Sequence, residues 1–218
     1  MPSKSFKNFE SNLIKDVVRL IGSHSTLNHD GQGKRGLGHI TRSGIVMLCA
    51  AWERYIEGVL VDSVQYLIRD IDLPTSLPLD IQKTIAKAIK KDSHDLRCLD
   101  LAGEGWKKYY LEQIEKEAER LNTPKSHTIN DLFIRYTGLD SVSDSWTSGA
   151  TEIDKFVKNR CAIAHTGCEA SYIKIGDLKD SKILIEKTII EMDNYLADHL
   201  QALSQSGKTP WRRRKNQS

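Results

Sequence analysis

The chain has 218 residues, of which 39% are hydrophobic and 28% charged, as expected for a globular domain with one sizeable core. This composition excludes a collagen-like, mucin-like or wholly disordered chain. The formal net charge is +3, which hints at an anionic partner. Residues 209–218 contain four basic residues and no acid, so the rest of the chain has a formal charge of −1. The basic character is therefore concentrated in a C-terminal tail.

The cysteines and the N-terminus indicate an intracellular protein. Four cysteines without paired CxxC motifs predict reduced thiols rather than a disulfide framework or a zinc ribbon. The first ten residues are polar, and the longest apolar run, 45–52, is far shorter than the roughly 18 residues of a membrane helix. We expect a cytoplasmic protein without membrane contact.

Apolar residues recur at helical spacing along nearly the whole chain, and this predicts an all-α fold. A first helix is expected from Phe6 and ends at Gly22, and a connection rich in Gly and His follows over 23–38. The strongest apolar stripe predicts a long central helix over 40–70. A short amphipathic helix is expected over 79–91, after two prolines.

The second half of the chain predicts four more helices and no internal repeat. They are expected over about 99–121, from Thr128 or Asn130 to Tyr136, over 151–166 before Gly167, and over 177–203. A Ser-rich loop over 138–149 and a short extended piece over 170–175 connect them. We expect a single-domain helical bundle in residues 1–205, with long central and C-terminal helices, followed by a basic, disordered tail over 206–218.

Two further patterns allow a ligand site but lack its usual context. Residues 31–36 match GxGxxG, yet no strand precedes them and no βαβ unit follows, so a flexible connection is the default and a nucleotide loop the alternative. Two groups contain possible metal ligands but not the close pairs that zinc sites use, and we expect no metal and no cofactor. The groups are His24, His29 and His39, and Cys161, His165 and Cys168.

The motif with the most chemical content lies at the end of the helix predicted over 151–166. Arg160 and His165 flank four small or apolar residues there, and Gly167 follows. Residues five apart lie about 140° apart around an ideal helix, so they share a face only if His165 is in a frayed last turn. From the residues alone, a functional pair and a surface arginine with a dipole-compensating histidine both stay open.

The order R-x4-H on a late helix of an all-α chain resembles the signature of the HEPN superfamily. The stretch Ala51-Trp-Glu-Arg-Tyr-Ile-Glu57 is similar to the small-aromatic-Glu segment of the HEPN branch associated with RiboL-PSP and of related toxin-like members. The two-proline connection over 73–78 also fits that branch, and the likeness spans roughly residues 10–200.

This resemblance implies a metal-independent endoribonuclease that works as a homodimer, with two R-x4-H motifs facing each other. Arg160 and His165 take the catalytic roles, and Asn159 and Glu53 are supporting residues. An arginine holds a phosphodiester through paired N–H bonds, and an imidazole, which titrates near neutral pH, exchanges protons with the reacting oxygens. Cys161 departs from the family pattern, because many members have Asn, Asp or His after the arginine.

RNA is the expected partner, and an antitoxin or another regulatory protein is a further candidate in a toxin or defence role. Arg212, Arg213 and Arg214 of the tail are expected to bind RNA, with Trp211 able to stack on a base. Two alternatives stay open. One is a non-catalytic HEPN module that binds RNA, a nucleotide or a protein partner. The other is a helical oligomerisation domain whose motif is coincidental.

Overall fold

A computed structural model describes residues 1–28, 35–167 and 172–214, and within these ranges the chain is helical without any strand. The N-terminal half contains α1 (Lys4–Asn8), a π-helical turn (Phe9–Leu13), α2 (Lys15–Leu27), α3 (Gly38–Asp70) and α4 (Leu79–Lys91). The C-terminal half contains α5 (Gly105–Ala118), α6 (Ser126–Thr137), α7 (Ala150–Thr166) and α8 (Ile175–Leu203). Short 3₁₀ turns lie at Arg35–Leu37, Pro74–Ser76, Arg97–Leu101 and Val142–Ser145. The prediction of an all-α fold is confirmed.

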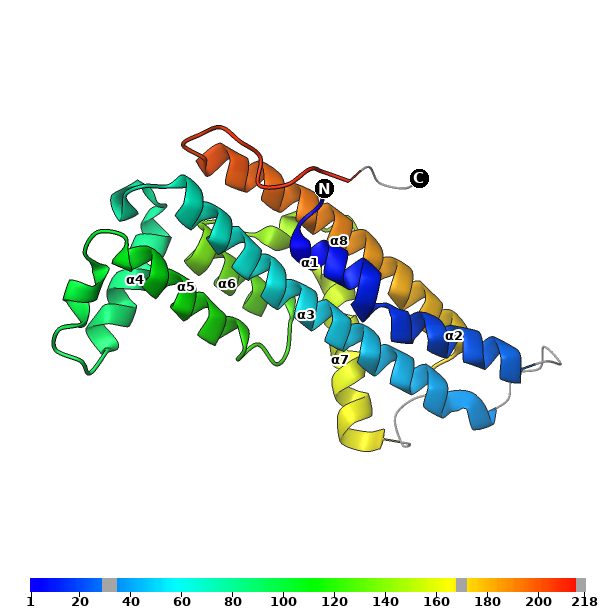
Figure 1. Ribbon diagram of the computed structural model, residues 1–218. Coiled ribbons are helices and arrows are strands. Elements are labelled where there is room, and N and C mark those ends of the chain that lie inside the picture. The colour runs from blue at the N-terminus through cyan, green and yellow to red at the C-terminus, as the bar shows by residue number, and fades with distance from the viewer. Residues whose placement is uncertain (29–34, 168–171, 215–218) are drawn as a thin grey trace.

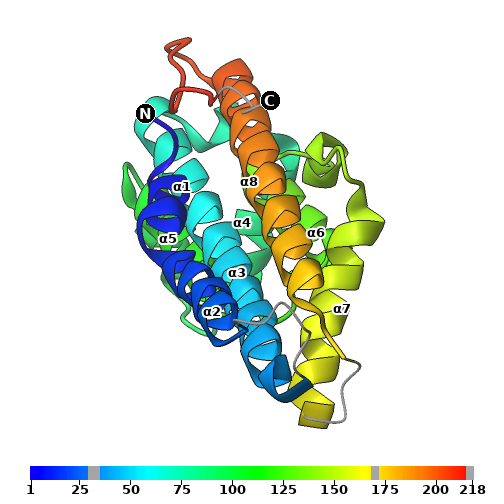
Figure 2. The same ribbon diagram turned by 90° about the vertical axis from the view of Figure 1, so that its right-hand side faces the viewer.

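Helix α3 is the central element, as its apolar stripe predicts. It runs through the middle of the bundle beside α8, and α1, α2, α5, α6 and α7 also pack against it (Figures 1 and 2). Trp52 and Tyr55 at its centre are fully buried, and their rings stack with centroids 6.1 Å apart. The indole of Trp52 donates a hydrogen bond to the Pro124 carbonyl at 3.2 Å, which ties α3 to the segment before α6.

Three predicted element boundaries are wrong. The first helix does not end at Gly22 but continues to Leu27, where Ser25 and Thr26 hydroxyls bond back to carbonyls four residues earlier. The helix expected over 99–121 is divided into a 3₁₀ turn and α5. The piece 170–175 was expected to be extended, but its residues 170–171 lie outside the described residues and Ile175 already begins α8.

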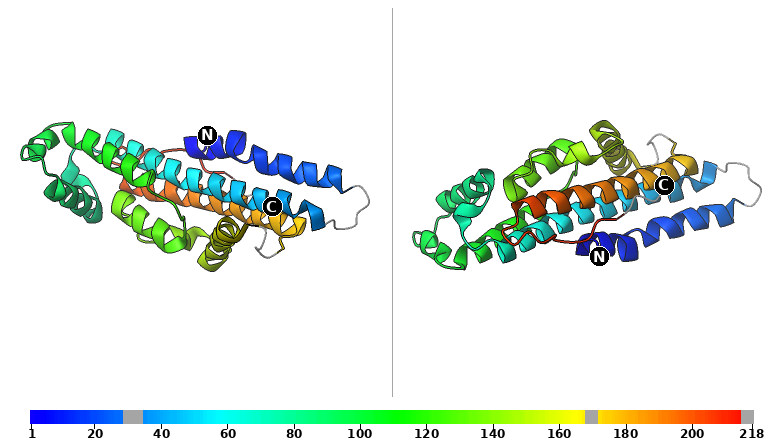
Figure 3. Two further views of the ribbon diagram at one scale, coloured as in Figure 1. Left: turned by 90° about the horizontal axis from the view of Figure 1, so that it is seen from below. Right: turned by 90° about the horizontal axis from the view of Figure 1, so that it is seen from above.

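The segment after α8 differs from the disordered tail that the sequence suggests. Residues 206–214 run back along α8 towards the N-terminus, as Figures 1 and 3 show. Trp211 is only 9% exposed and donates its indole N–H to the carbonyl of Asp193 at 2.9 Å. Arg214 pairs with Glu10, and its guanidinium lies 5.0 Å from the ring centroid of Phe6. The described part of the tail is therefore a packed element; 215–218 lie outside the described residues.

The carboxylate of Asp193 is buried where the N-terminus, α3 and α8 meet. The backbone N–H and the hydroxyl of Ser3 donate to it, and the hydroxyl of Tyr55 lies 3.5 Å away. The pKa of Asp193 is raised to about 6, mainly by burial and to a smaller extent by the carboxylate of Asp62, although the bonds from Ser3 lower it.

This raised pKa predicts that stability falls as pH rises. Below about pH 4 both the folded and the unfolded chain hold the Asp193 proton, whereas between about pH 4 and 6 only the folded chain does, so deprotonation favours unfolding. Raising the pH from 4.5 to 7.5 should lower the free energy of unfolding by about 2 kcal/mol through this group. Urea titrations of the wild type and Asp193→Asn at both pH values test this. If the wild type and Asp193→Asn differ in unfolding free energy by the same amount at both pH values, the prediction is wrong.

Candidate functional site

The candidate site is built on α7, whose apolar face packs on the bundle. Gly149 precedes the helix with φ +81°, and Gly167 ends it with φ +54°. The buried residues of α7 are Ile153, Phe156, Val157 and Ile163. Among residues 158–167 only Ile163 is buried, and most of the others are exposed. The C-terminal half of α7 therefore projects from the bundle (Figure 1).

Arg160 and His165 do not converge within one protomer. Helix α7 is regular through Thr166, so the frayed last turn that would bring the two side chains to one face is absent from this described segment. They lie about 140° apart around the helix and about 7.5 Å apart along its axis. Arg160 is half-buried beside α3, whereas His165 is exposed on the outer side. Within the described part of the chain, neither side chain forms a hydrogen bond or an ion pair.

The structure does bring Arg160 close to Glu53 of α3. Burial raises the pKa of Glu53, Glu57 raises it further, and the positive charge of Arg160 opposes this shift. The same guanidinium acts on the buried Cys49 thiol, whose pKa burial raises to about 12. No ion pair within 4 Å joins Arg160 and Glu53, both of which are described. Arg160 is thus half-buried between α7 and α3, and within the described part of the chain its charge is not used in an ion pair.

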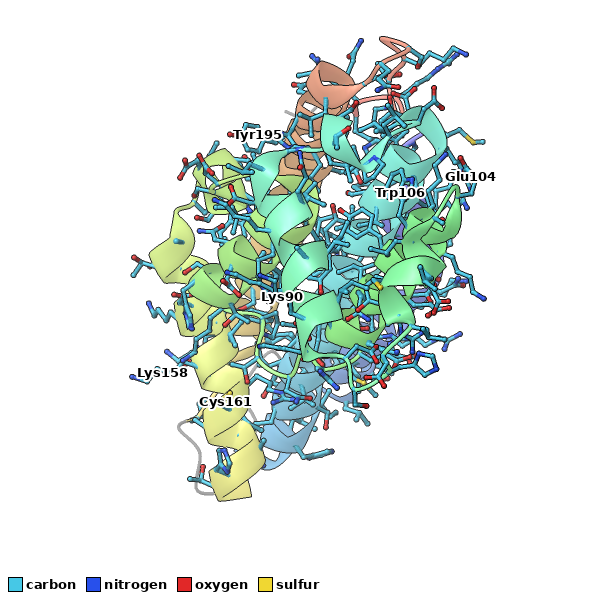
Figure 4. All side chains as sticks on the ribbon, turned by 90° about the vertical axis from the view of Figure 1, so that its left-hand side faces the viewer. Lys90, Glu104, Trp106, Lys158, Cys161 and Tyr195 are labelled. Atoms are coloured by element: carbon cyan, nitrogen blue, oxygen red, sulfur yellow. The ribbon has the colours of Figure 1, made fainter. Side chains whose placement is uncertain are left out.

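Asn159 and Cys161 flank the arginine on different sides of α7. Asn159 is exposed and points to solvent, while Cys161 is half-buried and carries a free thiol. Figure 4 shows Cys161 and Lys158 on the projecting part of α7. Cys161 adds to the raised pKa of Cys49, which places the two thiols near each other between α3 and α7.

A hollow of about 410 Å³ beside the end of α7 was not predicted from the sequence. The first turns of α3 contribute His39, Arg42 and Ser43, and α7 contributes Ile163 and the following Gly167. A ring nitrogen of His39 lies 2.9 Å from the Gly36 carbonyl oxygen. A sequence signal was available, because polar residues at positions 39, 42 and 43 share one face of the predicted helix, beside its apolar stripe. Arg42 therefore supplies a second cation next to the R-x4-H segment.

The two histidine and cysteine groups do not form a metal site in the part of the chain that the structure describes. Within 1–28, 35–167 and 172–214, no three His, Cys, Asp or Glu side chains are placed to hold a metal ion. His24 is buried in α2, whereas His165 is exposed on α7. His29, Cys168 and residues 31–34 of the GxGxxG pattern lie outside the described residues.

A scan against protein-family models matches RiboL-PSP-HEPN over residues 5–198. The chain belongs to the RiboL-PSP-HEPN family. The match includes Glu53, Arg160 and His165, so the resemblance seen in the two short motifs is confirmed. Searches of curated proteins and of solved structures give no match. Among the described helices of this HEPN protein, none is both long and apolar enough to cross a bilayer.

The three tail arginines of this HEPN chain lie away from the end of α7. The tail follows α8, whereas the end of α7 projects from the opposite side of the bundle (Figures 1 and 2). Arg213 pairs with Asp198 and Arg214 with Glu10, while Arg212 is exposed. Trp211 is buried and therefore not available to stack on a base. RNA binding by these arginines stays a prediction, now for a surface separate from α7.

Proposed function

We propose that this HEPN protein is a metal-independent endoribonuclease whose site forms when two copies bring their α7 helices together. The observation that carries the proposal is the position of the motif: Arg160 and His165 lie on the exposed, projecting half of α7. The family match spans both residues, which disfavours a chance occurrence of R-x4-H.

The separation of the two side chains supports a composite site. One protomer presents Arg160 towards α3 and His165 on the outer side, about 140° away. In this proposal a second copy packs along the projecting half of α7 and reaches both faces, so that the partner of each residue comes from the other copy. Little steric resistance is expected on either face, because the exposed residues Ala162, three before His165, and Ala164, four after Arg160, are small.

The proposed chemistry is attack by the RNA on its own phosphodiester. The 2′-oxygen forms a bond to phosphorus, and the bond from phosphorus to the 5′-oxygen breaks. One imidazole takes the 2′-hydroxyl proton, and an imidazolium or water protonates the leaving oxygen. The guanidinium of Arg160 stabilises the added negative charge on the phosphorane through paired N–H bonds. The products are a 2′,3′-cyclic phosphate and a 5′-hydroxyl.

Glu53 and Asn159 have supporting roles in this proposal. Glu53 lies on α3 near Arg160, and its raised pKa reflects its partial burial. In this proposal the negative charge of Glu53 helps to hold the guanidinium between α3 and α7. Asn159 is exposed next to Arg160, and in this proposal its side-chain amide donates to a phosphate oxygen.

A second candidate function, a non-catalytic HEPN module that binds RNA, a nucleotide or a protein partner, is favoured by Cys161. Its thiol is half-buried and lies near Cys49. Many family members have a polar side chain at the position of Cys161, directly after the arginine. A thiol is a weak hydrogen-bond donor, so it replaces that polar group poorly. A toxin or defence role, with an antitoxin or another regulatory protein as partner, belongs to the first candidate.

Cleavage products distinguish the two functions. Purified protein with excess chelator is expected to cut RNA and leave 2′,3′-cyclic phosphate ends, while DNA of the same sequence stays intact because it lacks the nucleophile. End-group analysis by mass spectrometry and gel electrophoresis measures this. Absence of cutting at high enzyme concentration favours the non-catalytic module, and cutting that requires an added divalent metal contradicts the proposed chemistry.

A further inference from the structure

A basic groove lies at the end of the molecule formed by α4 and α5 and contains no residue of the R-x4-H motif (Figure 1). It has a volume of about 580 Å³ and lies between α4 and α5, with residues of α6 as its floor. Helix α4 packs on α6, and α5 packs on α3, so the two walls are held apart by different neighbours. Figure 4 looks onto this end of the molecule, with Lys90 of α4 labelled.

The walls of the groove carry like charges that face each other. Lys83, Lys87 and Lys91 line it from α4, Lys116 lines it from α5, and Arg120 lines it from the turn that follows α5. The α4 lysines are four residues apart, so they form one row with a rise of about 6 Å per step. Positive walls across an open groove repel each other, and an anion between them removes this repulsion.

The acidic residues of the groove are already paired. Asp80 lies 3.6 Å from Lys83, and Glu117 lies 3.3 Å from Arg120 and 3.1 Å from Arg135. Asp92 is held by Arg97, 2.8 Å away and outside the groove lining. By contrast, the part of the chain that the structure describes contains no ion pair for three lining lysines. These are Lys87, Lys91 and Lys116.

Two tyrosines and an arginine line the groove beside its lysines. Tyr109 of α5 and Tyr136 of α6 are 5% and 3% exposed. Burial raises the pKa of Tyr136 to about 12, so its hydroxyl stays a donor. The guanidinium of Arg135 lies over the Tyr136 ring, 5.5 Å from its centroid. Arg135 itself is paired with Glu117 and with Asp131, 2.9 Å away, so the cations left for a ligand are the three lysines without an ion pair. Such ammonium groups along an open groove suit a chain of phosphates better than an uncharged ligand.

From these contacts we infer that the groove between α4 and α5 binds the phosphodiester backbone of a single RNA strand. The inference rests on the proposed function, because a ribonuclease needs a surface that holds the strand away from the cleaved bond. Lys158 and Cys161 of α7 are visible from the same side as the groove in Figure 4, so one strand can reach both from one side.

The test is binding of a fluorescent 2′-O-methyl RNA of about 16 nucleotides, which lacks the 2′-hydroxyl nucleophile and is not cleaved. In anisotropy titrations, the triple variant Lys87→Gln, Lys91→Gln, Lys116→Gln is expected to bind about 10- to 100-fold more weakly at 0.1 M salt. The slope of log K against log salt should fall by about 2, because each phosphate contact on a single strand contributes about 0.7.

The matched control removes three other exposed lysines, Lys15, Lys179 and Lys208, by the same change to Gln. It alters the net charge equally and is expected to bind nearly as the wild type does. Equal weakening in both variants overturns the inference, since net charge alone then explains the loss. Displacement of the strand by an equimolar mononucleotide also overturns it and assigns the groove to a small phosphate ligand.

Failure of the groove and failure of the proposed function give different results. If the wild type does not cut RNA but its binding depends on the three lysines, the nuclease proposal fails and the groove stands. If the wild type cuts RNA and the triple variant binds and cuts as the wild type does, the groove inference fails alone.

Discussion

Replacing His165 by Ala, or Arg160 by Ala, is expected to lower the rate of RNA cleavage by about 10²- to 10⁴-fold. The reason is the loss of the proton-transferring imidazole or of the guanidinium that stabilises charge on the phosphorane. Folding should change little, because His165 is exposed on the projecting half of α7. Single-turnover cleavage of a labelled RNA and thermal melting of each variant measure the two effects separately.

Matched controls for these substitutions are His127→Ala and Arg19→Ala. Both side chains are exposed, on α6 and α2 respectively, and Arg19 forms only a surface pair with Asp16. They should keep wild-type cleavage. If the His165 and Arg160 variants also cut at the wild-type rate, the R-x4-H motif has no part in the chemistry and the proposed function is wrong.

A mixing experiment uses the same variants to test the composite site. In a mixed dimer, one subunit with Arg160→Ala keeps His165, and the other with His165→Ala keeps Arg160. The geometry of α7 separates the two side chains within a protomer, and in the proposed site they pair between subunits. Activity should therefore return when the two inactive variants are unfolded, mixed and refolded together. A strict monomer in light scattering at micromolar concentration would contradict the composite site.

Helical periodicity was sufficient to predict the elements that are buried by a continuous apolar face. Helix α4 begins and ends at the predicted residues, and α3 differs only by two residues at its start. Local backbone geometry explains one predicted boundary that is wrong. Gly103 adopts φ +57°, and a Cβ on Gly105 would lie 1.8 Å from the Asp100 carbonyl oxygen, so the helix expected from residue 99 begins only at Gly105.

Gly22 shows the opposite case, because the helix continues through a glycine at which the sequence pattern predicts its end. A glycine costs about 1 kcal/mol inside a helix, which the burial of His24 in the following turn offsets. A Cβ on Gly22 would meet no atom within 4 Å, so no turn or close contact requires a glycine there. The helix therefore continues.

The motif residues of the site were visible in the sequence, but their surroundings were not. The family resemblance indicates Arg160, His165 and Glu53. In the structure Glu53 on α3 lies near Arg160 on α7. Arg42 belongs to a hollow formed by the start of α3 and the end of α7, and the lysines of the groove belong to a surface formed by the packing of α4, α5 and α6. A row such as Lys83, Lys87 and Lys91 is typical of a solvated helix face until its facing wall is known.

The C-terminal tail shows how charge alone misleads. Its four basic residues suggested a detachable RNA-binding segment, although Trp211 in the same segment already gave a signal for packing. In the structure this indole is buried against α8, and the charges of Arg213 and Arg214 are used in ion pairs. Removal of the tail therefore acts first on stability.

Trp211→Ala is expected to lower the free energy of unfolding by about 3 kcal/mol, at the low end of the range for large aromatic residues because the ring lies at the edge of the core. The substitution also leaves the Asp193 carbonyl without its indole donor. Deletion of residues 209–218 should cost at least as much, since it removes in addition the pair between Arg214 and Glu10. Urea unfolding followed by circular dichroism measures both.

Arg212→Ala is the matched control, because this neighbouring side chain is exposed and only its backbone N–H bonds to the Met1 carbonyl, at 2.8 Å. It should stay within about 0.5 kcal/mol of the wild type. At a temperature where the Trp211→Ala protein is still folded, its cleavage rate at saturating RNA should equal that of the wild type, because the tail and the end of α7 lie on opposite sides of the bundle. A normal unfolding free energy together with lost cleavage would instead place the tail in the catalytic site of a partner subunit.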